Sequence, residues 1–138
     1  TKYCTNSDDG TYDGKSTLEL ADDAARANWG GSWRMPTKEE QDELRDNCTW
    51  EWTTQNGVEG YKVTSKKKGY TKNSIFLPAA GYRYDSSFSS VGSCGHYWSS
   101  LLHTDDPYFA WHVFFDSDDV IRRYNARYNG RSVRPVCP

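Results

Sequence analysis

The sequence contains few hydrophobic residues and no long apolar run. Hydrophobic residues make up 36% of its 138 positions, and no stretch approaches the roughly 20 apolar residues of a membrane-spanning helix. No segment resembles a signal peptide, and the chain starts abruptly at Thr1, so we expect a mature or trimmed piece of an exported protein. Direct insertion into a membrane is not expected.

An excess of charge of one sign is also lacking. The chain has 17 Lys and Arg residues against 19 Asp and Glu, a formal net charge of −2, and the two signs are mixed along its length. Nucleic-acid-binding domains carry a basic stripe or patch, and proteins that adsorb to membranes carry a polybasic one. Neither kind of partner is therefore expected.

Cysteines are few, and none stands in a CxxC pair: Cys4, Cys48, Cys94 and Cys137. This spacing argues against a zinc site and favours disulfides in an oxidising, extracellular compartment. We predict a disulfide between Cys48 and Cys137, which the loop-entropy model values at roughly 3 to 5 kcal/mol. Free buried thiols are the alternative.

Motifs for metals and cofactors are missing as well. Residues 116–119, DSDD, place several carboxylates close together, but an EF-hand also needs a glycine and a distant bidentate glutamate, and the segment lacks both. Glycine-rich phosphate loops do not occur either. We expect no metal and no cofactor.

Aromatic residues, in contrast, are abundant. They make up 15% of the chain, with six Trp and ten Tyr. Such a composition predicts a core built from few, large side chains, and a surplus of Tyr and Trp is typical of binding surfaces. The length fits one domain over residues 1–138.

Two helices are expected in the N-terminal part of the chain. In STLELADDAARANWGG, Ser16 and Glu19 have the spacing of a capping box, and Gly30 is a stop signal. In MPTKEEQDELRDNC, Thr37 and Glu40 repeat that spacing. Both segments are predicted to be helical.

The remainder of the chain has the character of short strands. Residues 1–16 are predicted to form a polar loop. Segments rich in β-branched and aromatic residues follow, bounded by Gly and Asn, at residues 49–65, 73–83, 95–102, 109–115 and 132–136. This order predicts an α+β fold, with two N-terminal helices packed on one side of a twisted, mainly antiparallel sheet with long irregular loops.

One predicted strand, AWHVFF, carries large side chains on both faces. The face expected in the core comprises Trp111, Val113 and Phe115. The second face comprises His112, Phe114 and Asp116 and is followed by a polar loop over residues 118–129. Aromatic area gathered on a surface marks a contact site, so this face is predicted to be displayed. The alternative is a second core face under the helices.

Several motifs in chain order, WGGSWRMPT, NSIFLPAAGYR, GHYWSS and GRSVRPV, resemble the Fibrobacter succinogenes major paralogous domain. That family is related to the formylglycine-generating variant of the C-type lectin fold. The resemblance runs from about Asp13 to the C-terminus and implies a C-type lectin-like fold.

The ending GRSVRPV also resembles the variable proteins of diversity-generating retroelements, whose C-type lectin scaffold displays residues altered by adenine-directed mutagenesis. The resemblance implies a variable ligand-binding region over residues 84–131. The implied ligand-binding residues are Asp85, Ser87, His96, Asp105, Tyr108, Phe109, His112, Phe114, Asp116, Asp118, Asp119, Ile121, Arg123, Tyr124, Asn125, Tyr128 and Asn129.

The resemblance therefore implies a non-enzymatic receptor-binding or adhesin module on a bacterial surface or phage particle. Its partner would be a protein or glycan ligand on another cell or particle. A fixed carbohydrate-binding or adhesin domain is one alternative. An enzyme of the formylglycine-generating type is another, and it would use Cys94, which lies two residues from His96 on the same strand face.

Overall fold

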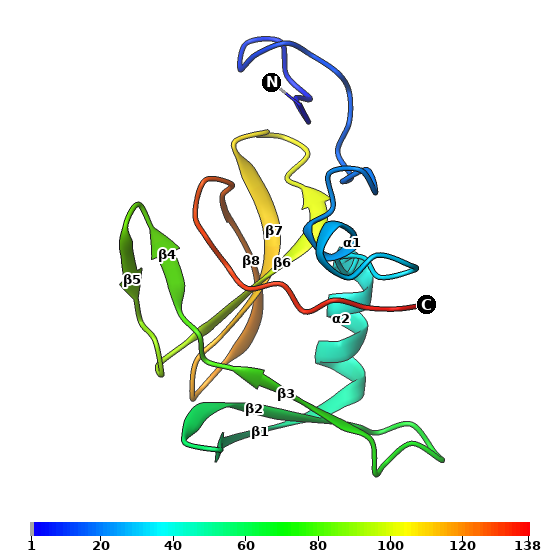
Figure 1. Ribbon diagram of the computed structural model, residues 1–138, viewed down its shortest axis with the longest axis vertical. Helices are drawn as coiled ribbons and strands as arrows, with labels where there is room; N and C mark the ends of the chain where they lie inside the picture. The colour runs from blue at the N-terminus through cyan, green and yellow to red at the C-terminus, as the bar shows by residue number, and fades with distance from the viewer. Residues whose placement is uncertain (1) are drawn as a thin grey trace.

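A computed structural model describes residues 2–138, and it is mostly β. Eight strands form three sheets in which all strand pairs are antiparallel (Figure 1). The two helices have only six and ten residues. This corrects the expected α+β, C-type lectin-like fold, because the strands are divided among separate sheets and the helices are too short to cover one. Neither helix of the described chain is long and apolar enough to cross a bilayer.

Helix α1 (Ala24–Trp29) is shorter than predicted. Its cap is Asp23, whose carboxylate accepts hydrogen bonds from the first backbone N–H groups of the helix. The predicted end at Gly30 is confirmed, with a positive φ of 66°. The predicted start at Ser16 is wrong, because the next residue forms an isolated β-bridge with Leu101.

Helix α2 (Lys38–Asn47) begins with the predicted capping box. The backbone N–H of Glu40 donates to Oγ1 of Thr37 over 3.1 Å, and the Glu40 carboxylate accepts from the Thr37 N–H over 2.9 Å. The helix is anchored by Gln41, which is buried and donates to the carbonyl of Tyr97 over 2.9 Å. The capping box thus fixes where the helix begins, and the Gln41 side chain attaches the helix to β6.

The first sheet comprises β1 (Cys48–Gln55), β2 (Val58–Ser65) and β3 (Ser74–Pro78), in that order. A hairpin of β4 (Tyr82–Tyr84) and β5 (Ser87–Ser89) forms the second sheet. The turn between β1 and β2 is the sequence Asn-Gly, and both of its residues have positive φ, as a two-residue hairpin turn requires.

The third sheet comprises β6 (Gly95–Leu102), β7 (Phe109–Phe115) and β8 (Val120–Ala126), with β7 in the centre. Strand β8 lies within the segment predicted to be a loop. The predicted strand at residues 132–136 is absent, and this segment contributes only isolated bridges. In Figure 1, the β4–β5 hairpin and the two helices lie on opposite sides of this sheet.

The core lies between the first and third sheets and is aromatic, as predicted. Phe115 has no exposed surface, and its ring centroid lies 5.3 to 6.3 Å from four other aromatic rings, those of Trp50, Trp52, Tyr61 and Tyr97. Its cross-strand partner is Gly95. A Cβ atom at that glycine would lie 2.1 Å from the Phe115 ring, so the core requires glycine there.

The predicted disulfide between Cys48 and Cys137 is wrong, because all four cysteines are free. Cys48 follows the last residue of α2. The C-terminal segment runs past the other end of that helix, where Val136 forms a bridge with Arg34. Ten helical residues span about 15 Å, whereas bridged cysteines need Cα atoms within about 7 Å.

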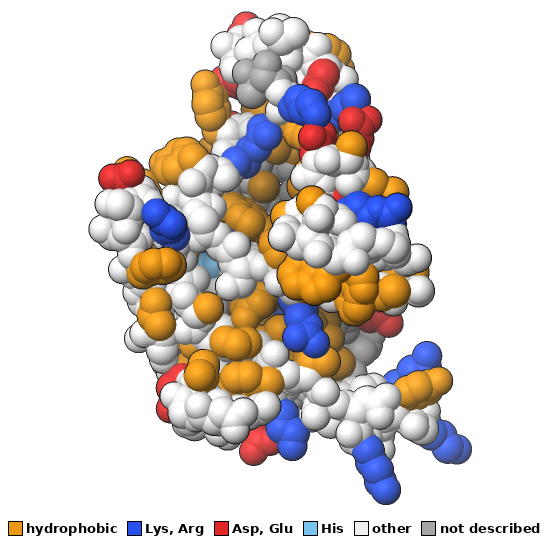
Figure 2. Space-filling model, in the orientation of Figure 1, with side chains coloured by type: hydrophobic (Ala, Val, Ile, Leu, Met, Phe, Trp, Pro, Cys, Tyr) orange, Lys and Arg blue, Asp and Glu red, His pale blue; other side chains and the backbone are white. Residues whose placement is uncertain are grey.

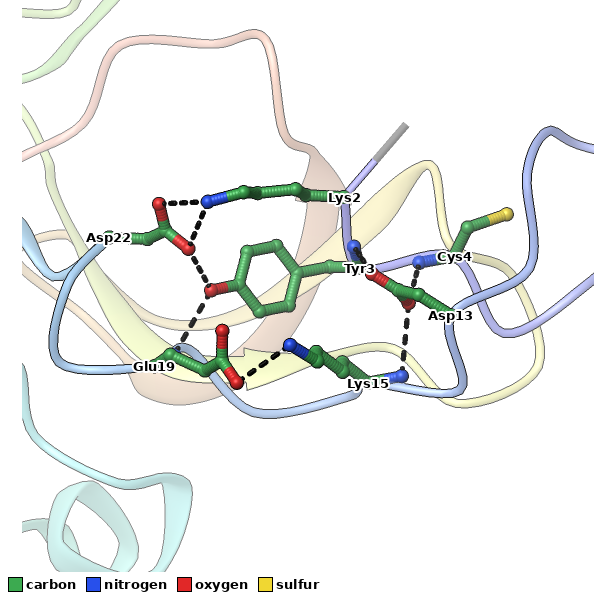
Figure 3. A network of polar contacts seen from close by, with 7 residues as sticks. All are labelled: Lys2, Tyr3, Cys4, Asp13, Lys15, Glu19 and Asp22. Carbon is green, nitrogen blue, oxygen red and sulfur yellow. Dashed lines mark hydrogen bonds and ion pairs between the residues drawn. The ribbon is translucent and has the colours of Figure 1, made fainter.

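The N-terminal segment has no helix or regular strand, as predicted, but a polar network holds it in place (Figure 3). The carboxylate of Asp13 accepts hydrogen bonds from the backbone N–H groups of Tyr3, Cys4 and Lys15 over 2.7 to 3.0 Å. These backbone donors, that of Lys15 first, lower the pKa of Asp13 to about 2. Arg127 donates to the carbonyl of Tyr3 over 3.1 Å and ties the segment to the end of β8.

Candidate functional site

The third sheet has a face that turns away from α2. Cross-strand pairs share a face, and the register places two such rows here: His96, Phe114 and Ile121, then Trp98, His112 and Arg123. The opposite face meets α2, where Arg122 donates to Asp42 over 2.6 Å. The predicted core face of β7 is confirmed for Val113 and Phe115, which are buried. Trp111 is only partly buried and lies outside the core.

The second face of β7 is not freely displayed. His112 is 1% exposed and His96 is 8% exposed, so neither imidazole is displayed on an open surface, although His96 borders a hollow described below. The helices do not cover them either, which also contradicts the alternative. Their cover is Arg131, in the segment after β8.

The chain around Arg131 is fixed by backbone hydrogen bonds on both sides. Gly130 and Arg83 exchange two of them, at 2.7 and 2.8 Å, which joins this segment to β4. Ser132 bonds to the backbone of β6, where its N–H donates to the carbonyl of His96 over 3.0 Å. The Arg131 side chain is thus held between the hairpin and the sheet, over the buried histidines.

Arg131 Nη1 binds both histidines. It donates to Nε2 of His112 over 2.6 Å and to Nδ1 of His96. Both ring nitrogens accept, so both imidazoles are neutral. Burial, followed by the charge of Arg131, lowers the pKa of His96 to about 4 and that of His112 to about 2.

The other ring nitrogen of His96 faces Cys94. The Cys94 Sγ lies 3.5 Å from His96 Nε2, and both side chains are buried. Burial raises the pKa of Cys94, so this pair is a thiol beside a neutral imidazole. His96 Nδ1 and His112 Nε2 lie 3.3 Å apart, and Arg131 Nη1 contacts both. Within residues 2–138, no three His, Cys, Asp or Glu side chains are grouped to hold a metal ion.

The guanidinium of Arg131 has no anionic partner among residues 2–138. It lies over the ring of Trp98, with Cζ 4.7 Å from the ring centroid. The ion pairs of residues 2–138 involve neither Arg131 nor Arg123. Arg131 Nε is buried and has no hydrogen-bond partner in the described chain. Burial lowers the pKa of Arg131 to about 10, which leaves it a cation at neutral pH.

Beside this guanidinium lies a hollow of about 540 Å³, which we call the Arg131 pocket. Its lining residues come from β4, β5, β6, β8 and the segment after β8: Tyr82, Tyr84, Ser87, Phe88, Ser89, His96, Asn125, Asn129 and Arg131. In Figure 2, a small area of histidine surface is visible in a hollow beside the β4–β5 hairpin.

The rim of the Arg131 pocket is aromatic. Phe88 is 72% exposed, Tyr84 57% and Tyr128 76%. The rings of Tyr84 and Tyr128 are in edge contact, with centroids 6.1 Å apart, so the hairpin and the segment after β8 meet there. Inside the rim, Asn129 Oδ1 is buried and has no hydrogen-bond partner among residues 2–138.

The structure brings together only part of the predicted ligand-binding set. Pocket-lining members are Ser87, His96, Asn125 and Asn129. Members at the rim or in the hairpin turn are Tyr128 and Asp85. Members on the same sheet face are His112, Phe114, Ile121 and Arg123.

The remaining predicted residues lie elsewhere. The β7–β8 turn contains Asp116, Asp118 and Asp119, and the β6–β7 loop contains Asp105 and Tyr108. The opposite sheet face carries Tyr124 and Phe109. The Tyr124 ring contacts that of His103, with centroids 4.4 Å apart and the ring planes tilted by 46°, so Tyr124 does not form one patch with His112 as predicted.

Sequence reasoning missed Arg131, Tyr82, Tyr84 and Phe88 as pocket residues. Arg131 ends the expected variable region, residues 84–131, and lies in the motif GRSVRPV, but it was not among the expected ligand-binding residues. It meets His96 across 35 residues of sequence, and no local pattern signals such a contact. The positive φ of Asp85 marks the turn that brings the hairpin residues to the pocket.

Comparison with known proteins gives one family. Residues 49–136 match the family described as a domain of unknown function, DUF8237. The match spans the strands from β1 to β8 and the segment that carries Arg131. No curated protein and no solved structure matches the chain.

Proposed function

The chain belongs to the DUF8237 family, and from the geometry of its Arg131 pocket we propose that it is a non-enzymatic ligand-binding module. A single observation carries this proposal: a cation without a protein counter-charge lies at the floor of an open pocket with an aromatic rim. Pockets that combine aromatic walls with a few placed polar groups are typical ligand sites. We place the protein on a bacterial surface or phage particle, with its ligand on another cell or particle.

Binding without chemistry is supported by the state of the buried groups. A catalytic cysteine needs its thiolate form and a base that can accept a proton. Here burial raises the pKa of Cys94, and the pKa of His96 is low. Neither change activates the sulfur, which disfavours the formylglycine-generating alternative.

Diversification of this site by a retroelement is the second part of the proposal. Ser87, Asn125 and Tyr128 are exposed and make no core contacts. Substitutions at these positions would change ligand contacts at little cost in stability. Variation at His112 would instead remove a hydrogen-bond acceptor from Arg131. The mutable set is therefore the rim, above a constant cationic floor.

Deep sequencing of this gene across one source population tests diversification. We expect substitutions to concentrate at Ser87, Asn125, Tyr128 and Asn129, with Arg131 constant. An even, sparse spread of substitutions would favour a fixed carbohydrate-binding or adhesin domain.

A screen on glycan and peptide arrays tests the site itself. A double variant, Tyr84→Ala with Tyr128→Ala, should lose the binding seen for the wild type. Tyr108→Ala, also at an exposed tyrosine but in the β6–β7 loop, should retain it. Equal loss in both variants would place the ligand outside the Arg131 pocket.

A further inference from the structure

Arg131 is the only charged residue among those that line the Arg131 pocket. His96, the other titratable base there, is neutral because it accepts a hydrogen bond from the guanidinium. Burying a charge is unfavourable unless an opposite charge or hydrogen bonds compensate it. The protein supplies two imidazole acceptors but no anion, so the pocket floor keeps a net positive charge.

The guanidinium is also held rigidly. Nη1 is fixed by two histidine acceptors, and the plane of the group is supported by the Trp98 ring. A guanidinium presents paired N–H donors that match the two oxygens of a carboxylate. Because its position is set before binding, little side-chain entropy is lost when such a group arrives.

One positive charge suits a monoanion. Dianionic phosphate sites commonly add further cations or a nest of backbone N–H groups. The nearby cation Arg123 lies over the ring of Phe114, with Cζ 4.2 Å from its centroid, and does not line the pocket. A carboxylate therefore matches the floor better than a phosphate.

The walls of the pocket indicate what carries the carboxylate. Exposed rings of Tyr84, Phe88 and Tyr128 offer flat apolar faces at the rim. Between them, the Ser87 hydroxyl can donate and accept, and the Asn125 amide can donate through its NH₂ group. The Asn125 carbonyl oxygen already accepts hydrogen bonds from Ala126 and Asn129. A sugar ring has C–H groups on its faces and hydroxyls around its edge, so it fits both kinds of wall.

We infer that the Arg131 pocket binds an acidic saccharide, whose carboxylate pairs with Arg131 while its ring lies against the aromatic rim. This inference rests on the proposed function, because it requires that the pocket be the ligand site.

Matched saccharide probes test the inference by calorimetric titration of the full chain. The acidic probes are trigalacturonic acid and sialyllactose, and the neutral ones are the methyl ester of trigalacturonic acid and lactose. We expect binding of an acidic probe and at least about tenfold weaker binding of its neutral counterpart, as for a lost charge-assisted contact.

Two Arg131 variants and one control variant test whether Arg131 is the cation that pairs with the carboxylate of the ligand. Arg131→Lys keeps the charge but loses the planar fork, and Arg131→Gln loses both, so the affinity should fall in that order. Arg123→Gln removes the same charge from outside the pocket and should leave the affinity unchanged. Since Arg131 variants can disturb the buried histidines, Asn125→Ala, at an exposed pocket position, serves as a second test and should also weaken binding.

Equal binding of the acidic and neutral probes, or no binding of the acidic ones, overturns the inference. Selective binding of a sulfated saccharide or of a peptide C-terminus also overturns it. If a neutral ligand binds and depends on Tyr128 but not on Arg131, the proposed function stands and only the inference fails. If no array ligand depends on the pocket, both fail.

Discussion

Arg131 Nη1 donates a hydrogen bond to Nε2 of His112 over 2.6 Å, across the face of β7 that the sequence pattern predicts to be displayed. This contact covers His112, and no residue of β7 lines the Arg131 pocket. The residues that can reach a ligand there belong to the β4–β5 hairpin, to the ends of β6 and β8, and to the segment after β8.

Replacing His112 should destabilise the domain. His112→Ala removes a side chain that is 1% exposed and one of the two acceptors of Arg131, so we expect a loss of about 2 to 4 kcal/mol. Tyr128→Ala, at a residue that is 76% exposed, should stay within about 0.5 kcal/mol of the wild type. Urea denaturation at pH 7 measures both, and similar losses would contradict the burial of His112.

Stability should fall in mild acid. The pKa of His96 is about 4 in the folded chain against an ordinary 6.5, so between these values the unfolded state binds more protons. The contribution of His96 to the free energy of unfolding is therefore complete above pH 6.5. It decreases by up to about 3 kcal/mol as the pH falls toward 4. Urea denaturation over this pH range measures the decrease. The buried His112, whose pKa is about 2, adds a decrease of its own over the same range. His96→Gln should therefore reduce the slope without abolishing it, and an unchanged slope in that variant would count against the assignment.

Glycine should be required opposite Phe115. Gly95→Ala places a methyl group against the ring, and overpacking of this kind costs about 1 to 3 kcal/mol. Gly69→Ala is the control. A Cβ atom at Gly69 would meet open space, but the residue has a positive φ of 87°, so the substitution should lower the free energy of unfolding by about 1 kcal/mol or less. Thermal or urea unfolding measures the stability of both variants. A larger loss of stability in Gly69→Ala than in Gly95→Ala would contradict the requirement for glycine opposite Phe115.

The N-terminal segment should loosen when Asp13 is changed. Asp13→Asn leaves a single side-chain acceptor oxygen for three backbone donors, so hydrogen exchange at the amides of Tyr3 and Cys4 should accelerate. In the wild type, the pKa of about 2 should preserve their protection until the pH approaches that value. Asp8→Asn, the same change at an exposed residue, should have no effect, and accelerated exchange there would contradict the role of Asp13.

Much of the local structure was predictable because its signals are local. The Thr37 and Glu40 pair marks the start of α2 through hydrogen bonds that close within one helical turn. The alternation in β7 identified Val113 and Phe115 as core. The same reasoning failed at Ser16, where the capping spacing is present but the chain forms a bridge to β6.

The fold class and the site depended on contacts that sequence spacing does not reveal. Alternation shows that His112 and Phe114 share a face of β7, but not which segment covers that face. The family resemblance grouped Tyr124 with His112 in one ligand-binding set, yet the register places Tyr124 on the opposite face, beside Trp111. These outcomes follow from how the strands pair across the chain.

The sequence by itself determined where most elements lie, because capping, turns and strand alternation act over a few residues. It also determined an aromatic core and the residue types available for a site. Only the tertiary structure decided that the strands form three sheets and that Arg131 reaches His96 over 35 residues of chain. Such long-range contacts depend on the joint packing of distant segments. They bring Arg131 and His96 together at the floor of a cationic pocket, although no local sequence pattern links the two residues.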